Sequence, residues 1–362
     1  LPAPPSFTVL CPTGCPTFNP RNRHGELGWT VETSLDVEYA HAMAPGANIV
    51  LVVASTSSGD DINAAEAKAI ELYPGSVMSQ SFGIPEIVVH ADNAHLLQAV
   101  RNYVAATQAG ITLLASAGDF GATNGFASAN ASFPASFPLT LAVGGTEGNP
   151  YTDPGTATLS CAANTTCSAG LATFTGPCSS LKPGFLRSPC TPVGYGGERV
   201  WNEPFFAPGS TTGGAPSLIF PVPAYQNGLG LATRTVPDVS YNAAIHGGVL
   251  IANSTIAGFP AFFLVGGTSA GSPQWAAIMA LANQAAGRPL GFVNAAIYTL
   301  AHSGTYASDF HDITQGNNQM PGTPVGFSAT TGWDDATGWG TPNVSNFIRD
   351  LVACVKGGAC GQ

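Results

Sequence analysis

The chain has 362 residues, of which 11 are Lys or Arg and 21 are Asp or Glu, so its formal net charge is −10 with 9% charged residues. This sparse, acidic balance argues against nucleic acid and anionic membranes as partners. It also suits acidic solution, because a protein with few cations accumulates little self-repulsion when its carboxylates are protonated. No apolar run is long enough to span a bilayer, and the Pro-rich start is not a signal peptide, so we expect a processed or trimmed chain.

The cysteines indicate the compartment. Eight cysteines, an even number, favour an oxidising setting outside the cytoplasm, and we expect a secreted protein. None has the spacing of a zinc site. They form three groups, in which we expect local pairing while the connectivity stays open: Cys11 and Cys15; Cys161, Cys167, Cys178 and Cys190; Cys354 and Cys360. Asn-x-Ser/Thr sequons begin at Asn130, Asn164, Asn253 and Asn343.

The first predicted element is a helix that carries two carboxylates. Apolar side chains recur at helical spacing from Val31 to Met43, and Glu32 and Asp36 are spaced i, i+4, which places both on one face. Two such acids repel when both are ionised, which favours a shared proton or a facing partner. Taken alone, such a pair is more often a solvated face near a helix N-terminus. Its interpretation therefore depends on the motifs further along the chain.

Strand-like and helix-like runs then alternate, which predicts an α/β fold with a mostly parallel sheet covered by helices. The runs cover residues 48–54, 61–72, 76–79, 91–109, 111–115 and 139–143. From about residue 152 to 214 the pattern dissolves into Gly, Pro, Ser, Thr and Cys, which predicts a disulfide-stapled surface insertion. Strands resume at residues 248–252 and 261–265. We find no internal repeat and expect one domain over residues 1–362.

Two loops that follow predicted strands carry candidate catalytic groups. The strand at 111–115 leads into Ser-Ala-Gly-Asp, ending at Asp119, which either caps the loop or, held protonated, donates a hydrogen bond to an oxyanion. The strand at 261–265 leads into Gly-Thr-Ser-Ala-Gly-Ser-Pro, residues 267–273, and the run 274–286 predicts a helix. Ser269 then lies at a helix N-terminus, where free N–H groups favour a developing anion. A small-residue turn that packs a helix on a sheet is the structural alternative.

The same five residues, 267–271, fit the G-x-S-x-G elbow of an α/β-hydrolase, which needs an acid and then a His downstream. The downstream His302 and His311 lie in the same short segment as the neighbouring acids, so no ordered series of Ser, acid and His stands out. The His-Gly-Gly motif at His246 lies close to Ser269 in the sequence instead of far upstream. A subtilisin-type triad needs Asp and His upstream, yet His24 is the only upstream His followed by Gly. The usual histidine base is therefore missing.

Three motifs in this order resemble the sedolisin family of serine-carboxyl peptidases. They are Glu-Thr-Ser-Leu-Asp-Val-Glu at 32–38, Ser-Ala-Gly-Asp at 116–119 and Gly-Thr-Ser-Ala-Gly-Ser-Pro at 267–273. Shorter matches at 79–83, 142–146 and 237–240 extend the resemblance over residues 28–342. The resemblance implies a subtilisin-like fold with Ser269 as nucleophile, Glu32 as base, Asp36 as its support and Asp119 as oxyanion stabiliser. Since a carboxylate base must be ionised while a carboxyl donor stays protonated, we expect activity below neutral pH.

The resemblance also implies one structural Ca²⁺ in the region 308–342. Its ligands are the carboxylates of Asp312 and Asp334 and the carbonyls of Ile313, Thr330 and Gly332, where two Asx-rich turns are the structural alternative. We expect a peptide substrate to pair with the extended backbone edge of Ser79, Ser81 and Gly83, and we expect Gly144 and Gly145 to line the substrate cleft. Packing at the ends of strands explains either set equally well.

A sedolisin catalytic domain carries more sequence before the carboxylate helix, including early strands, than the roughly thirty residues found here. Three explanations stay open: another chain supplies these strands, the sequence is truncated, or this protein has rebuilt the edge of its sheet. We expect polypeptide substrates, a monomer, and the cleaved pro-domain or an N-terminal segment as a further partner. Endopeptidase action is the default over tripeptidyl release. An α/β-hydrolase-type esterase and an inactive, calcium-stabilised binding module are the alternative functions.

Overall fold

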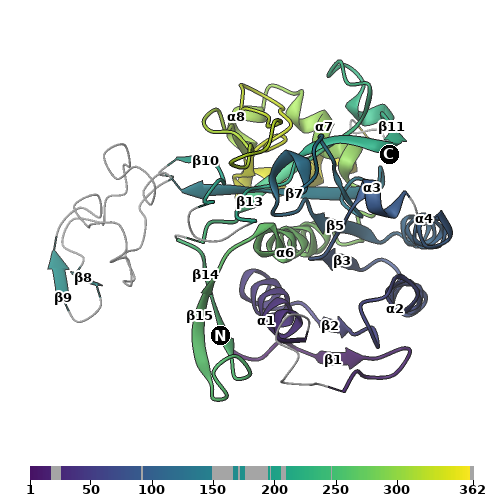
Figure 1. Ribbon diagram of the computed structural model, residues 1–362, viewed down its shortest axis with the longest axis vertical. Helices are drawn as coiled ribbons and strands as arrows, with labels where there is room; N and C mark the ends of the chain where they lie inside the picture. Colours follow the sequence, from purple (N-terminus) through teal and green to yellow (C-terminus); the bar gives the residue numbers. More distant parts are fainter. Residues whose placement is uncertain are drawn as a thin grey trace.

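The computed structural model describes residues 1–17, 26–90, 93–148, 166–169, 172–175, 195, 197–204, 209–245 and 247–358. Its central sheet joins β3 (Val77–Gln80), β5 (Thr112–Ser116), β7 (Thr140–Gly148) and β13 (Val239–Asn242) in parallel, and β10 (Glu198–Val200) adds an antiparallel strand. This confirms the predicted mostly parallel sheet (Figure 1).

Helices cover both faces of this sheet because neighbouring residues of a strand point to opposite sides. In β5, Leu114 packs in a cluster with Trp275 of α6 (Thr268–Ala286), α7 (Asn294–Ala301) and α9 (Val344–Gly357). Its neighbour Leu113 packs on the other side with Ile70 of α2 (Gly59–Leu72) and Tyr103 of α4 (Asn93–Gln108). All five residues of β5 are buried, as expected for a strand in the middle of an α/β sheet.

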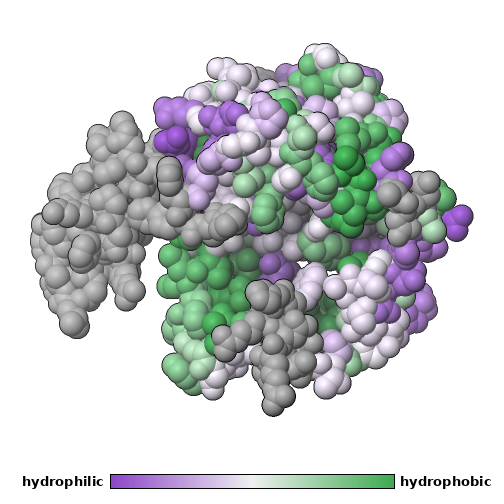
Figure 2. All heavy atoms as spheres, in the orientation of Figure 1, coloured by the Kyte–Doolittle hydropathy of each residue, from purple (hydrophilic) through white to green (hydrophobic). Residues whose placement is uncertain are grey.

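A hairpin and a strand pair lie outside this sheet. β1 (Phe7–Leu10) pairs in parallel with β2 (Ile49–Val52), and these two strands form a sheet of their own. The predicted strands at 248–252 and 261–265 form the antiparallel hairpin of β14 (Val249–Asn253) and β15 (Ala261–Val265). Its inner face packs on Leu35 of α1 (Glu26–Met43), while Leu250, Phe262 and Leu264 are exposed and contribute to the apolar surface over β14 and β15 in Figure 2.

The other elements are short or peripheral. They are β4 (Ile84–Pro85), α3 (Glu86–Val89), the 3-10 turn Gly121–Thr123, β6 (Ser132–Phe133), β8 (Thr166–Ala169), β9 (Ala172–Thr175), β11 (Ala215–Pro221), the 3-10 turn Ala224–Gln226, β12 (Thr233–Val236), α8 (Tyr306–Asp309), β16 (Phe310–His311) and β17 (Thr341–Pro342). Within the described ranges, no helix combines the length and apolar character that crossing a membrane needs.

The structure tests part of the disulfide predictions. Cys11 and Cys15 form a disulfide, as expected for the first group. Cys354 is disulfide-bonded too, although Cys360 lies outside the described residues. Most of the predicted insertion, with Cys161, Cys178 and Cys190, also lies outside them, as do His24, His246 and Asn164.

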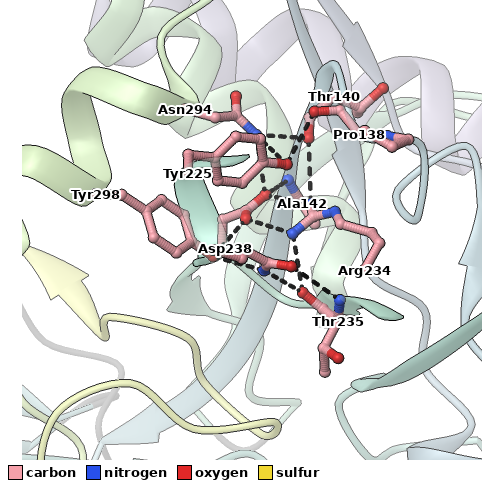
Figure 3. Close-up of polar contacts among 10 residues, drawn as sticks. Pro138, Thr140, Ala142, Tyr225, Arg234, Thr235, Asp238, Asn294 and Tyr298 are labelled. Atoms are coloured by element: carbon pink, nitrogen blue, oxygen red, sulfur yellow. Dashed lines mark hydrogen bonds and ion pairs between the residues drawn. The ribbon is translucent and has the colours of Figure 1, made fainter. Parts of the chain in front are cut away.

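A buried polar network fixes β13 against β7 (Figure 3). Asp238 accepts hydrogen bonds from both terminal nitrogens of Arg234 at 2.6 Å, from the Tyr298 hydroxyl at 2.8 Å and from the backbone N–H of Ala142 at 2.8 Å. Neither partner of the ion pair has any exposed side-chain surface, so each charge is stabilised by the other and by hydrogen bonds within the protein, which for Arg234 include those to the carbonyls of Thr235 and Thr140. β13 leads directly to Ala243, whose carbonyl accepts from the N–H of Gly267 at 2.7 Å, just before the candidate nucleophile.

Candidate active site

Helix α1 brings both predicted carboxylates to one place. Leu35 is buried against Ile251 and Ala270, and this anchors the helix face that carries Glu32 and Asp36 beside α6. Burial raises the pKa of Asp36 to about 7, although a hydrogen bond from Ser81 opposes the shift. The pKa of Glu32 is raised well above its ordinary value, first by burial and then by the nearby charges of Asp36 and Asp119. The two acids therefore favour a state with a shared proton.

Ser269 lies in the first turn of α6, facing Glu32. The Ser269 hydroxyl interacts with the Glu32 carboxyl and partly offsets the raised pKa of Glu32. The same Oγ donates a long hydrogen bond of 3.5 Å to the Ser81 carbonyl. Oε1 of Glu32 is buried and has no hydrogen-bond partner among the described residues. A nucleophile in contact with a carboxylate that has spare acceptor capacity is the geometry that general-base catalysis requires.

The predicted start of this helix at residue 274 is wrong. α6 begins at Thr268, and Pro273 lies inside it. A proline at this position lacks the N–H that would bond to the carbonyl four residues earlier, which is that of Ser269. The hydroxyl of Ser81 lies 3.3 Å from this carbonyl, and the same hydroxyl donates to Asp36 Oδ1 at 2.5 Å. Ser81 thus links the carboxylate pair to the backbone of the nucleophile.

Among the described residues, the hydrogen bonds that hold Asp119 go to one of its carboxyl oxygens, Oδ1. Its Oδ1 accepts from the Thr268 N–H and from the Thr268 hydroxyl, both at 2.8 Å, and that hydroxyl in turn accepts from the N–H of Gly118 at 3.1 Å. Oδ2 points over Gly267, where an added Cβ would lie only 2.7 Å away. Gly267 has φ +120°, so both its conformation and its lack of a side chain keep Oδ2 accessible.

The pKa of Asp119 is also raised, chiefly by burial and against the two Thr268 hydrogen bonds. A raised pKa favours the protonated carboxyl, which can donate a hydrogen bond from Oδ2. The structure therefore brings together all four predicted catalytic side chains: Ser269, Glu32, Asp36 and Asp119. It adds Ser81, Thr268 and Gly267 as residues that hold them; of these, only Ser81 appears among the sequence predictions, and there as a substrate contact.

The five residues predicted to contact substrate are placed differently from one another. The Ser79 hydroxyl shares a hydrogen bond of 2.8 Å with Ser272 of α6, so it holds the strand to the helix. Gly144 and Gly145 are buried in β7, where a Cβ would lie 2.7 Å from Pro237 and Ala243, respectively. This indicates a packing role for both glycines. Gly83 follows Ser81 at the end of β3 and lies against Ser132 and Phe133 of β6.

The predicted calcium ligands converge on one loop. Both carboxyl oxygens of Asp312 accept from the Gly332 N–H at 3.1 Å, and Asp334 Oδ2 accepts from the Thr330 N–H at 2.9 Å. No hydrogen bond within the described residues reaches the carbonyl oxygens of Ile313, Thr330 or Gly332. Ile313 is only 1% exposed, and a buried carbonyl without a partner is unusual. These oxygens fit a hard cation, although no group of three or more His, Cys, Asp or Glu side chains gathers in the described residues.

The arrangement differs from both histidine-based alternatives. Ser269 follows β15 of the hairpin, whereas the elbow of an α/β-hydrolase follows a strand of the central sheet. Four of the five described histidines have partners elsewhere: His41 on the Pro2 carbonyl, His95 on Asp60, His302 on the Tyr298 carbonyl, and His311 stacked on Tyr195. Within the described residues, the group that faces Ser269 is a carboxyl.

Comparison with known proteins agrees with this geometry. The family model described as "Subtilase family" matches residues 18–340. Kumamolisin of Bacillus sp. (strain MN-32) is 32% identical over 365 residues, covering 96% of this chain and 54% of its own length. Sedolisin of Pseudomonas sp. (strain 101) is 29% identical, covering 91% of this chain and 50% of its own. Tripeptidyl-peptidase 1 of Rattus norvegicus is 28% identical, with 89% and 52% covered.

The chain thus spans about half the length of the curated relatives it matches. Among solved structures, that of Pseudomonas sedolisin, a serine-carboxyl proteinase in complex with two molecules of pseudo-iodotyrostatin, has a TM-score of 0.70 and 26% identity. That match covers 98% of this chain and 92% of the sedolisin chain. Ser269 faces a carboxylate at the start of α6, and the matches cover most of the sequence. The chain therefore belongs to the subtilase family and, within it, to the sedolisin group of serine-carboxyl peptidases.

Proposed function

We propose that this chain is the catalytic unit of a secreted serine-carboxyl endopeptidase that cleaves polypeptides in acidic solution. The observation that carries the proposal is the contact of the Ser269 hydroxyl with a buried carboxyl, Glu32, opposite a second carboxyl, Asp119, that keeps one oxygen accessible. Kumamolisin and sedolisin are similar to this chain over most of its length, which supports the same chemistry.

In the proposed reaction, Ser269 Oγ attacks the scissile carbonyl carbon while Glu32 accepts the hydroxyl proton. Asp36 carries the other proton of the acid pair and so lets Glu32 be ionised without a second charge beside it. Protonated Asp119 donates from Oδ2 to the oxyanion, since Oδ1 is occupied by Thr268. Glu32 then returns the proton to the leaving amine, and water, deprotonated by Glu32, hydrolyses the acyl-enzyme.

Two variants test these roles at pH 4–5 on a denatured protein substrate. Ser269→Ala is expected to lower kcat/KM by at least about 1000-fold, because no covalent intermediate can form. Glu32→Gln keeps the shape but cannot accept the proton, so a loss of about 100-fold or more in kcat is expected. Circular dichroism of each variant controls for folding. Near-normal turnover by both folded variants would rule out the mechanism.

The pH–rate profile tests the carboxyl pair separately. Activity falls on the acid side when Glu32 is protonated and on the alkaline side when Asp119 loses its proton. Burial raises the pKa of both groups, so the profile should peak above the ordinary carboxyl range of about 4 and still below neutrality. An optimum near pH 8 would exclude Glu32 as the base, and labelling of Ser269 by an organophosphonate at neutral pH would favour the esterase alternative.

We also propose that one Ca²⁺ stabilises the loop of Asp312 and Asp334, held with the carbonyls of Ile313, Thr330 and Gly332. Chelation by EGTA should then lower the Tm by several degrees, because a ligand that binds only the native state stabilises it by mass action. Asp312→Asn should abolish the response to EGTA. An unchanged Tm of the unsubstituted chain with EGTA would contradict the site.

A tripeptidyl-peptidase is the second candidate, because proteins of that name are among the relatives over 89% of this chain. The two activities differ in the need for a free substrate amine. We expect a blocked peptide and its twin with a free N-terminus to be cleaved at internal bonds at similar rates. Release of tripeptides from the free twin alone would replace endopeptidase action by tripeptidyl release.

A further inference from the structure

Three polar side chains meet in the interior, on the side of the sheet that α2 and α4 cover (Figure 1). Glu66 comes from α2, Tyr103 from α4 and Gln80 from the end of β3. They are 7%, 1% and 2% exposed, respectively. The ring of Tyr103 packs against those of Phe133 and Phe137, with centroids 5.8 and 5.5 Å away, so its hydroxyl is held in a largely apolar surrounding. The proposed mechanism uses none of the three polar side chains.

The hydroxyl of Tyr103 faces two acceptors at once. Its oxygen lies 2.9 Å from Glu66 Oε1 and 2.8 Å from Gln80 Oε1. A phenol has one O–H proton, so it donates to one of these two oxygens at a time. If the Glu66 carboxyl is ionised, the other acceptor faces a lone pair of the hydroxyl at hydrogen-bond distance, with no proton between them. Such a contact is repulsive, and it is costly among buried groups.

The position of the Gln80 amide argues against the simplest alternative. A rotated amide would turn its NH2 group toward Tyr103 and so supply the missing proton. The same rotation would turn Gln80 Oε1 toward the Leu114 carbonyl, which the NH2 group contacts at 3.4 Å. Two carbonyl oxygens would then face each other without a proton. The amide therefore donates to Leu114, and Gln80 Oε1 accepts the proton of Tyr103.

A proton on Glu66 satisfies every group in this chain. Protonated Oε1 donates to Tyr103, Tyr103 donates to Gln80, and Gln80 donates to the Leu114 carbonyl. The other oxygen of Glu66, Oε2, accepts from the Asn102 side chain at 3.4 Å. Burial raises the pKa of Glu66 to about 7, against hydrogen bonds with Tyr103 and Asn102. The proton count and the burial therefore agree on a neutral carboxyl in acidic solution.

No charged side chain among the described residues takes the place of this proton. Tyr103 is the titratable group that α4 presents to Glu66, and β3 presents the neutral Gln80 to Tyr103. None of the charged or ionisable side chains of α2 and α4 contributes to the raised pKa of Glu66. Those that are not buried are Asp60, Asp61, Lys68, Glu71, His95 and Arg101.

We propose that Glu66 is a positioning residue of the active site, whose carboxyl proton completes a hydrogen-bond chain through Tyr103 and Gln80 that fixes the end of β3. Gln80 is followed directly by Ser81, whose hydroxyl donates to Asp36 at 2.5 Å. When Glu66 loses its proton to solvent, Tyr103 turns its own proton toward the carboxylate, and Gln80 loses its partner. The end of β3 then loosens, and Ser81 holds Asp36 less firmly. The effect on turnover rests on the proposed function, whereas the proton on Glu66 does not.

Infrared difference spectroscopy tests the proton directly. A protonated carboxyl gives a C=O stretching band that a carboxylate lacks, and the band of Glu66 should fade as pH rises through about 7. Subtracting the spectrum of Glu66→Gln assigns this band, because Asp36 and Glu147 are present in both proteins. Glu71→Gln, on the exposed side of the same helix, is the matched control and should leave the band in place. If Glu66→Gln removes no such band at pH 5, the proposal is wrong.

The kinetic effect is measured as a ratio of kcat values, because loss of the Asp119 proton affects both enzymes alike. The kcat of Glu66→Gln, divided by that of the unsubstituted protein, should be about 1 at pH 4.5, since the Gln amide also donates to Tyr103. With an ionised form about tenfold slower, the ratio should reach about 2 at pH 7 and about 3 at pH 7.5. KM should change less than about twofold. A ratio that stays constant with pH would overturn the positioning role.

Removal of the Tyr103 hydroxyl tests the chain between the carboxyl and the strand. Tyr103→Phe should lower kcat about fivefold at pH 4.5 with little change in KM. In this background, Glu66→Gln should no longer alter the pH dependence of kcat, because the two residues act through one chain. A pH-dependent ratio that persists without the hydroxyl would refute the chain.

Hydrogen exchange gives a readout that needs no turnover. The protection of the Gln80 amide should fall at least about twofold between pH 4.5 and pH 7.5 in the unsubstituted protein and stay constant in Glu66→Gln. This pattern in an inactive protein would support the chain and contradict the proposed function. Equal protection of Gln80 at both pH values in the unsubstituted protein would refute the chain, whether or not the protein cleaves peptides.

Discussion

At the scale of single residues, the site depends on where side chains are absent as much as on where they are present. Ser269 and the three acids are visible in the sequence because their residue types and order form motifs. The role of Gly267 is not visible, because it depends on φ +120° and on the position of Asp119 Oδ2. Asp119 is held there by Thr268, which lies 149 residues further along the sequence. Such a contact arises only when two distant loops meet, and a single sequence contains no measure of it.

This geometry makes Gly267→Ala a sharp test. The added methyl meets Asp119 Oδ2 at 2.7 Å and strains a left-handed backbone, so we expect kcat to fall about 100-fold through displacement of the oxyanion donor. Gly287→Ala is the matched control at the other end of α6. Gly287 also has positive φ, +73°, but nothing lies within 4 Å of its Cβ position, so it should lose about 1 kcal/mol of stability and keep its activity. Equal activity of the two variants would contradict the role of Gly267.

At the scale of elements, the sequence pattern predicts the order of strands and helices well but misjudges where they meet. Periodicity places β2, α2, β3, α4, β5 and β7 within a few residues of their positions. It misplaces the start of α6, because Pro is read as a first-turn residue, whereas here small residues allow the helix to begin at Thr268, six positions before the predicted residue 274. It also cannot tell that β14 and β15 pair with each other, since pairing depends on contacts between segments.

The contact between the end of β3 and the start of α6 predicts a positioning role for Ser81. Pro273 leaves the Ser269 carbonyl without a helical partner, and the Ser81 hydroxyl bridges it to Asp36. Ser81→Ala should therefore lower kcat about 10-fold with KM changed less than about twofold, because positioning is lost and not substrate binding. Ser81→Thr retains the hydroxyl and should recover most of the loss. Ser303→Ala, a hydroxyl bonded to the Leu300 carbonyl, is the control. A rise in KM without a fall in kcat would instead identify Ser81 as a substrate contact.

At the scale of the whole molecule, the buried acids connect the fold to its chemistry. The sparse, acidic composition predicts tolerance of acid, and the structure supplies a physical reason. Burial raises the pKa of Asp36, Glu66 and Glu147 to about 7 each, against hydrogen bonds that lower it in every case. Sequence alone does not reveal which carboxyls are buried, because Glu66 and the exposed Glu71 lie on the same helix.

These three groups predict that stability declines between acid and neutral pH. An acid whose folded pKa is raised contributes stability that is fully present below its unfolded pKa, about 4, and is lost as pH rises through about 7. The free energy of unfolding in urea, measured with EGTA so that calcium ligands do not interfere, should therefore be higher at pH 4.5 than at pH 7.5.

Glu66→Gln mimics the protonated side chain within its hydrogen bonds to Tyr103 and Asn102, so it should stabilise the chain by up to about 3 kcal/mol at pH 7.5 and hardly at pH 4.5. Glu71→Gln on the exposed side of α2 should change little at either pH. Maximal stability at pH 7.5, or equal effects of Glu66→Gln at both pH values, would mean that these carboxyls are not held protonated by burial.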